Sequence, residues 1–177
     1  YGPNMDLQLD GNVALTTASS GGLGLASAES LAREGAHVAV CGRSEGPLED
    51  AREHLEPLGD GEVLAMSVDL TDRAEVEAYV ETVADEFGGI DHVVMSAGGP
   101  PSGAFLETSD EDWYDAFDLL VMSVVRLARE AEPYLQADGG GTITNVTSRS
   151  VKEALDSLVL SNSVRMGVIG LEKTLSK

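Results

Sequence analysis

The sequence predicts a doubly wound α/β fold, Rossmann-like, in which helices cover both faces of a parallel sheet. Strand-like and helix-like segments alternate along the chain, which is the pattern of successive βα units. A glycine-rich turn, TASSGGLG at 17–24, directly follows the first strand-like segment. The 177 residues suffice for one domain with a sizeable core, and no linker or internal repeat divides them. We therefore expect a single sheet with right-handed crossovers.

Three strand–helix pairs occupy the first half of the chain. The helices of the first and third pairs end at Gly35 and Gly88, where glycine can close a helix in a left-handed conformation. Pro47 lies near the first turn of the second helix, where a backbone N–H has no helical partner in any case. The expected strand and helix of each pair are 13–17 and 24–35, 37–42 and 47–59, and 62–70 and 72–89.

Two further pairs complete the alternation. Ser109 is the expected N-cap of a long fourth helix. The fifth helix reaches the end of the chain, so we expect the domain to be truncated after it. Residues 1–4 precede Met5 and are expected to be a remnant of expression, which leaves 5–177 as one domain. The expected strands and helices of this half are 90–99 and 109–136, and 141–148 and 158–177.

The charge balance excludes two classes of partner. Thirty-one acidic residues against eleven basic ones give a net charge of −20. Such a field repels nucleic acids and anionic membranes, so we expect neither as a partner. The acidic residues are spread through the expected helices, which favours adaptation to high salt (a halophilic protein) over an ordinary acidic protein.

The cysteine and hydropathy patterns narrow the class further. A single cysteine, Cys41, excludes an internal disulfide and a cysteine-based zinc site, and we expect no metal. This cysteine ends the apolar run HVAVC, so a buried, inert thiol is expected. The sequence has no secretory signal and no apolar run of membrane length, and the expected location is the cytoplasm.

The glycine-rich turn has the spacing T-G-x-x-x-G-x-G rather than G-x-G-x-x-G. Thr17, Gly22 and Gly24 match it, and Ala18 replaces the first glycine. Such a turn lets the backbone approach a pyrophosphate, which then rests at the N-terminus of the following helix. A tight βα turn without a ligand would contain the same glycines, but the position straight after the first strand favours a dinucleotide.

Three later motifs fall at expected strand ends: Asp69, SAGG at 96–99 and NVTS at 145–148. Together with the glycine turn they resemble the short-chain dehydrogenase/reductase family, from about residue 9 to the end, and most nearly its 3-oxoacyl-carrier-protein reductases. Asp69 would lie beside the adenine, and it could also cap the next helix. The resemblance implies cofactor contacts at Thr17, Ser19, Ser20, Gly22, Leu23, Gly24, Arg43, Asp69, Leu70, Ser96, Ala97, Gly98 and Arg165.

The position that reads the cofactor ribose distinguishes NADP from NAD. An acid about 20 residues beyond the glycines usually holds the 2′-hydroxyl. Here Gly42 occupies that region, and Arg43 follows it. A missing acid beside a guanidinium suits a 2′-phosphate, so we expect NADP, and NAD less readily. Arg43 could instead be simply solvated, and nearby Glu45 would oppose a phosphate.

The catalytic positions depart from the family pattern. The resemblance implies a serine at Ser148, a tyrosine thirteen residues later, a lysine four residues beyond that, and an asparagine on the fourth helix. This chain has Ser161, Arg165 and Leu120 at the last three positions. Ser161 and Arg165 share a helix face and could equally form a polar seam between helices. Tyr114, Tyr134 and His92 have better structural roles than catalytic ones.

The expected function is hydride transfer between NADP(H) and a small-molecule carbonyl or alcohol, with Ser148, Ser161 and Arg165 as catalytic residues. The alternative is a dinucleotide-binding protein that has lost turnover and acts as a sensor or assembly partner. The substrate is not predicted, because in the family the segment after the fifth helix builds the substrate loop. The resemblance also implies a homodimer or homotetramer, and the apolar fourth and fifth helices agree with it.

Overall fold

A five-stranded parallel sheet forms the centre of the computed structural model, which describes residues 7–137 and 140–176. The strand order β3-β2-β1-β4-β5 places the first strand in the middle, and all four neighbouring pairs are parallel. The predicted fold class is therefore confirmed; the expected remnant at 1–4 lies outside the described residues. The strands are β1 Val13–Thr16, β2 His37–Gly42, β3 Val63–Ser67, β4 His92–Met95 and β5 Thr142–Asn145.

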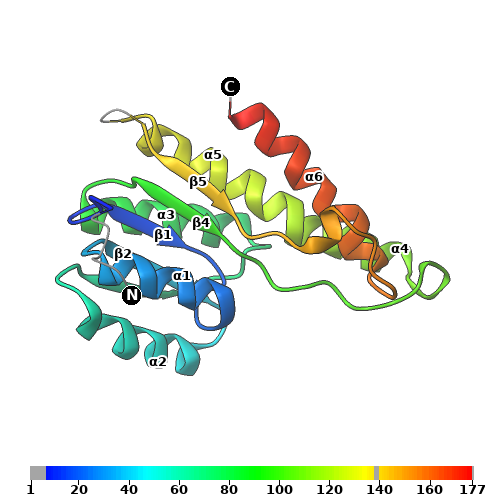
Figure 1. Ribbon diagram of the computed structural model, residues 1–177, viewed down its shortest axis with the longest axis horizontal. Helices are drawn as coiled ribbons and strands as arrows, with labels where there is room; N and C mark the ends of the chain where they lie inside the picture. Colours follow the sequence, from blue (N-terminus) through cyan, green and yellow to red (C-terminus); the bar gives the residue numbers. More distant parts are fainter. Residues whose placement is uncertain (1–6, 138–139, 177) are drawn as a thin grey trace.

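Helices cover both faces of this sheet (Figure 1). α1 and α2 pack on one face, whereas α3 and α5 pack on the other; α6 lies against α4 and the turn that follows it. The helices are α1 Gly22–Arg33, α2 Glu45–Leu55, α3 Arg73–Phe87, α4 Asp110–Phe117, α5 Ser123–Leu135 and α6 Val159–Leu175.

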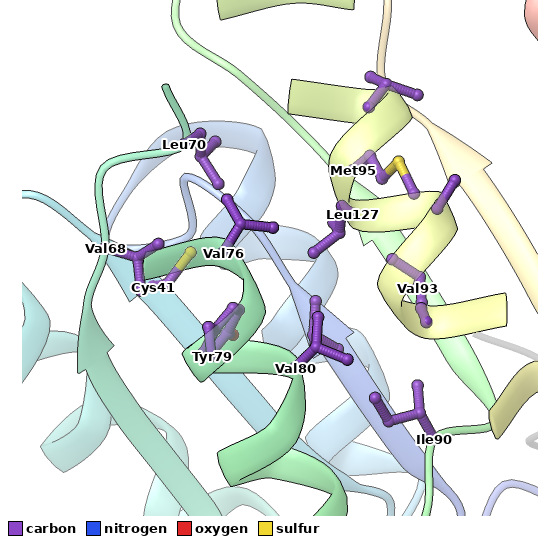
Figure 2. Packing of buried hydrophobic residues seen from close by; sticks show 14 of the residues in the cluster. Cys41, Val68, Leu70, Val76, Tyr79, Val80, Ile90, Val93, Met95 and Leu127 are labelled. Atoms are coloured by element: carbon purple, nitrogen blue, oxygen red, sulfur yellow. The ribbon is translucent and has the colours of Figure 1, made fainter. Parts of the chain in front are cut away.

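The strand β2 shows why this sequence needs both helical layers. Val38 and Val40 are fully buried against α1 and α2, while Ala39 and Cys41 are fully buried on the opposite face. An uninterrupted apolar run is what a parallel strand covered on both sides requires. Figure 2 shows Cys41 beside Tyr79 of α3, deep in the larger core.

The termini of α3 correct one expectation from the sequence. Asp72, not Asp69, caps this helix, because its carboxylate accepts the backbone N–H groups of Ala74 and Glu75. The helix ends as predicted at Gly88, whose φ of +86° is left-handed. The side chain of Asp69 is therefore not committed to capping the helix.

The long helix expected at 109–136 is interrupted by one wide turn. Ser109 caps α4 in a capping box with Asp112, as predicted. A π-helical turn at Asp118–Met122 then separates α4 from α5. Such turns insert one extra residue into a helix and often lie at functional sites. Leu120 belongs to this turn and is buried.

The parallel sheet gathers the strand ends at a single edge. The chain leaves β1, β4 and β5 on the same side of the sheet and enters the loops that lead to α1, α4 and α6 (Figure 1). Ligands of open α/β sheets bind at the carboxyl ends of their strands. The candidate site residues that follow each strand are thus brought together by topology alone.

Candidate functional site

The turn between β1 and α1 is held in a conformation that glycine favours. Ala18 has a left-handed φ of +47° and Gly22 one of +59°. Ala18 occupies the place of a glycine in the motif, and a residue with a Cβ adopts this conformation only at some cost. A Cβ on Gly24 would lie 2.5 Å from the carbonyl oxygen of Ala18, so the turn closes directly onto the helix. The left-handed φ at Gly22 and the close approach at Gly24 thus explain why both motif positions are glycine.

Two of the predicted contact residues point into the protein and support the turn instead. The Ser19 hydroxyl accepts the Cys41 N–H at 3.0 Å, and the Ser19 N–H donates to the Cys41 oxygen at 2.8 Å. The Thr17 hydroxyl donates to the carbonyl oxygen of Ser96 at 2.6 Å and accepts the Ser96 N–H at 2.9 Å. Both side chains are buried. Both side chains therefore hold the ends of neighbouring strands together beneath the glycine turn.

A third buried side chain supports the same turn from below. The phenolic O–H of Tyr79, on α3, donates to the carbonyl oxygen of Thr16 at 3.0 Å. Desolvation raises the pKa of Tyr79 well above its ordinary value, so the hydroxyl stays protonated as a donor. Sequence reasoning missed this residue, because the two partners are 63 positions apart in the chain and leave no local signal.

Outside this turn, a groove of about 620 Å³ runs along the carboxyl edge of the sheet. Its walls come from the segments that follow β1, β2, β3 and β4 and from α4 with the turn after it. The lining includes Ser20, Gly42, Arg43, Asp69 and Gly98, all of them predicted from the sequence as contact or ribose-reading positions. The volume falls in the range of small-molecule sites. The N-terminus of α1 has no side-chain cap and leaves its N–H groups for a ligand.

Gly42 is closely covered by the Ser20 hydroxyl. A Cβ at position 42 would lie 2.7 Å from Ser20 Oγ and 3.2 Å from Ser20 Cβ. An acidic side chain could not occupy this position without moving the serine. The hydroxyl of Ser20 therefore stands at the place where an NAD-binding acid would begin.

The charges at this end of the groove are mixed. Arg43 is exposed and has no hydrogen-bonded or ion-paired partner in the part of the chain that the structure describes. Hydrogen bonds from Thr71, and then the positive charge of Arg43, lower the pKa of Asp69. Asp115 and Asp118 also line the groove, and Asp118 pairs with Arg126 at 2.6 Å. An anionic ligand would therefore find one free guanidinium among carboxylates.

The three predicted catalytic residues are linked in one chain of hydrogen bonds. The Ser148 hydroxyl accepts the N–H of Ser150 at 3.1 Å. The Ser150 and Ser161 hydroxyls lie 3.2 Å apart, and Nε of Arg165 donates to Ser161 at 3.1 Å. Arg165 Nη2 also reaches the carbonyl oxygen of Gly98 at 3.4 Å, at the edge of the groove. Ser150 was missed from the sequence, since nothing in TSRS separates it from a surface serine.

Ser161 is buried, and its hydroxyl oxygen takes part in hydrogen bonds with both Ser150 and Arg165. Arg165 is half-buried, and desolvation lowers the pKa of its guanidinium, which stays charged at any ordinary pH. Arg165 therefore supplies a fixed positive charge and cannot accept a proton. Leu120 lines a small cavity next to Arg165 and contributes only apolar surface there.

Asn162 is a third residue that could not be singled out from the sequence. Its amide accepts the N–H of Leu155 at 3.1 Å and donates to the oxygen of the same residue at 2.9 Å. These two hydrogen bonds fix the turn before α6. Within that turn, Leu158 pairs with Gly103 in an isolated β-bridge. Asn162 thus positions the helix that carries Ser161 and Arg165.

The remaining candidates lie away from the groove. Tyr114 is 75% exposed on α4, and Tyr134 packs against the core near the end of α5. His92 lies at the start of β4, at the opposite edge of the sheet, bound to Asn12 and Thr142. Burial raises the pKa of the Cys41 thiol to about 12, which makes it inert at neutral pH, as expected.

Two features are absent from residues 7–137 and 140–176. No group of three or more histidine, cysteine or acidic side chains is arranged to hold a metal ion. No helix is long and apolar enough to cross a membrane.

Comparison with known proteins supplies the context for this geometry. A family model described as short chain dehydrogenase matches residues 12–177. FabG, a 3-oxoacyl-[acyl-carrier-protein] reductase from Vibrio cholerae, is 31% identical over 97% of this chain and 68% of its own length. D-threitol dehydrogenase from Mycolicibacterium smegmatis is 32% identical over 98% of this chain and 66% of its own.

Solved structures agree with the family match. The crystal structure of L-sorbose reductase from Gluconobacter frateurii, complexed with NADPH and L-sorbose, superposes with a TM-score of 0.92 at 37% identity. It matches 97% of this chain and 65% of its own. The chain spans 64% to 66% of the length of several curated relatives it matches.

Proposed function

Since this chain belongs to the short-chain dehydrogenase family, we propose that it transfers a hydride between NADP(H) and a small-molecule carbonyl or alcohol. The observation that carries this proposal is the groove at the carboxyl edge of the sheet. It joins the glycine turn, the ribose-reading position at Gly42 and the hydrogen-bonded chain that ends at Arg165. Ligands in open α/β sheets bind at this place.

The residues at the ribose end fit NADP better than NAD. The absence of an acid at Gly42, the hydroxyl of Ser20 above it and the unpaired guanidinium of Arg43 together suit a 2′-phosphate. Glu45 is exposed on α2 and does not line the groove, so it offers less opposition than its place in the sequence suggests. L-sorbose reductase and the actinorhodin polyketide ketoreductase, at 37% and 31% identity, were both solved with NADPH.

Each catalytic residue then has a role that its contacts allow. The bound cofactor would supply the hydride. Ser148 accepts one hydrogen bond and keeps its own O–H group, which would donate a hydrogen bond to the carbonyl oxygen of the substrate and polarise it. Arg165 would bind ribose oxygens with the N–H groups that Ser161 does not use. Ser161, or an ordered water beside it, would pass the proton to the product oxygen.

A second candidate function is a dinucleotide-binding protein without turnover. It is favoured by the engagement of Ser161 in an internal chain, since a committed hydroxyl is a poor general acid. A serine hydroxyl is also far more basic than a tyrosine, whose unperturbed pKa is about 10. Leu120 stands where the family resemblance implies an asparagine, so this region has one polar group fewer.

Two measurements distinguish the candidates. The first is binding of NADPH and of NADH in high salt, by cofactor fluorescence. The second is oxidation of NADPH with L-sorbose, other ketoses and a 3-oxoacyl thioester. Binding with turnover supports the oxidoreductase; binding without it supports the silenced protein, and the triple variant Ser161→Tyr, Arg165→Lys, Leu120→Asn should then gain turnover. Absence of binding to either cofactor would refute both.

We also propose that the protein forms a homodimer or homotetramer through the long helical segment made of α4 and α5 and through α6. Tyr114 and Phe117 on α4 are 75% and 48% exposed, and Met166 on α6 is 47% exposed. Large apolar side chains exposed on neighbouring helices are typical of an interface. Light scattering across a range of salt concentrations tests the proposal, and a monomer at every concentration would refute it.

A further inference from the structure

Asn145, the last residue of β5, carries a buried amide that has no partner. Both Nδ2 and Oδ1 are inaccessible to solvent and form no hydrogen bond with any described residue. Buried polar side chains in native proteins almost always have a partner, and an exception calls for a bound water, an ion or a function. Asn145 lies in register with Met95 of β4, on the face of the sheet that carries the larger core. An amide at this apolar position needs a reason.

A small cavity beside the amide can hold the missing partner. Its volume is about 20 Å³, which is enough for one water molecule. Its lining is mixed. Apolar side chains, among them Leu120, Val124, Leu127 and Val168, lie beside the polar residues Thr17, Ser96, Ser123, Asn145, Thr147 and Arg165. A purely apolar cavity of this size would stay empty, but Asn145 adds both a donor and an acceptor to the wall.

Arg165 supplies the second polar wall. Its Nε is bound to Ser161 and its Nη2 to the carbonyl oxygen of Gly98. Nη1 has no hydrogen-bonded partner among the described residues, although the side chain is half-buried. No carboxylate of the described chain pairs with this guanidinium. A water between Asn145 and Arg165 would satisfy an amide and a cation together.

We propose that Asn145 is a positioning residue: its amide binds one water in this cavity, and the water fixes the guanidinium of Arg165 toward the cofactor groove. The inference rests on the proposed function, because the benefit lies in how Arg165 meets the ribose. Ser161 holds the guanidinium from one side, and the water bound to Asn145 holds it from another. A flexible arginine would lose much more side-chain entropy on binding a ligand.

A partner other than water for the Asn145 amide would give different electron density beside it. Asn145 also lines a second groove, of about 680 Å³, between the ends of α5 and α6. A peptide backbone lying in that groove could pair with both amide atoms and make the water unnecessary. A high-resolution crystal structure of the cofactor-free protein separates the two. Density for a water bound to Asn145 supports the proposal, whereas an empty cavity or a main-chain partner overturns it.

Two variants test the positioning role in solution. Asn145→Leu fills the volume with apolar atoms and expels the water, while Asn145→Ala leaves room for additional water that can still reach Arg165. We expect the dissociation constant for NADPH to rise about tenfold in the leucine variant and less than about threefold in the alanine variant. The ranking by stability should be the reverse of the ranking by NADPH affinity. The leucine variant should have the higher melting temperature, because leucine leaves no cavity, although it binds NADPH more weakly.

This opposite ranking is the result that a packing role alone would not give. If NADPH affinity instead follows the melting temperature, or changes in neither variant, the proposal is wrong. Thr144→Val, at the exposed neighbouring position of β5, is the matched control and should change neither quantity. If the wild-type protein binds no NADPH, the proposed function fails, and the crystallographic test of the water still decides this inference.

Discussion

Introducing an acid at position 42 tests the ribose end of the groove most sharply. Gly42→Asp places a carboxylate where NAD-binding proteins of this fold hold the 2′-hydroxyl. In this chain the new Cβ would lie 2.7 Å from Ser20 Oγ, closer than a normal contact. The serine must therefore rotate away or the strand end must move. We expect the single substitution to damage NADPH binding without creating a good site for NADH.

The size of each effect follows from simple electrostatics. Two unit charges about 5 Å apart repel by roughly 3 kcal/mol at an effective dielectric constant of about 20, which is on the order of a hundredfold in affinity. Screening at high salt reduces this, so we expect NADPH to bind about ten- to a hundredfold more weakly. A hydrogen bond from a ribose hydroxyl to a carboxylate contributes about 1.5–3 kcal/mol, but only when Ser20 makes room.

Removing the obstruction should therefore reveal the gain. The double variant Ser20→Gly, Gly42→Asp is expected to bind NADH about tenfold more tightly than wild type. Gly46→Asp is the matched control: it adds the same charge nearby, at a position with nothing within 4 Å of its Cβ. Fluorescence titration with both cofactors at fixed salt measures all four proteins. If Gly42→Asp alone gains NADH affinity, the obstruction by Ser20 is wrong; if NADPH binding is unchanged, the groove is assigned incorrectly.

Four further outcomes are expected. Arg43→Ala should weaken NADPH about tenfold and leave NADH unchanged, because the guanidinium meets only the 2′-phosphate; equal losses in titrations would contradict this. Gly22→Val should abolish cofactor binding, because the new side chain faces the pyrophosphate path and a β-branched residue strains the left-handed φ of +59° in this turn; unchanged affinity would rule out the turn. Ser161→Ala should cost less than about tenfold in kcat/KM, and Arg165→Ala should cost more, through cofactor affinity; collapse of turnover in Ser161→Ala alone would make this serine the acid. Raising the KCl concentration should tighten NADPH binding, because a chain of net charge −20 repels the anion and salt screens that repulsion; weaker binding in titrations at high salt would oppose it.

The fold could be predicted because its determinants are local. The run HVAVC specifies a strand buried on both faces, and Gly88 and Ser109 mark helix ends through their own backbone and side-chain chemistry. The succession of such segments then fixes a parallel sheet, and parallel strands bring their carboxyl ends together. For this reason the positions of Ser20, Arg43 and Asp69 around one groove followed from the sequence.

The details that escaped prediction depend on contacts between distant segments. Whether Ser19 faces a ligand or the protein is decided by Cys41, and the support from Tyr79 depends on α3 packing beneath β1. The π-helical turn at Asp118–Met122 has no local signal in an otherwise regular helical pattern. The orphaned amide of Asn145 is visible only once the cavity around it exists.

The central place of β1 in the sheet has a consequence for how the protein is made. One edge of β1 pairs with β2, which follows it closely in the chain, but the other edge waits for β4, about 80 residues later. At synthesis rates of about 5–20 residues per second, that edge stays open for roughly 4–16 seconds on the ribosome. Val13–Thr16, whose four residues are all buried in the folded protein, thus has one unpaired edge throughout this interval. An unpaired apolar edge invites association with other chains, so production should depend on chaperones that cover it until Met95 has emerged.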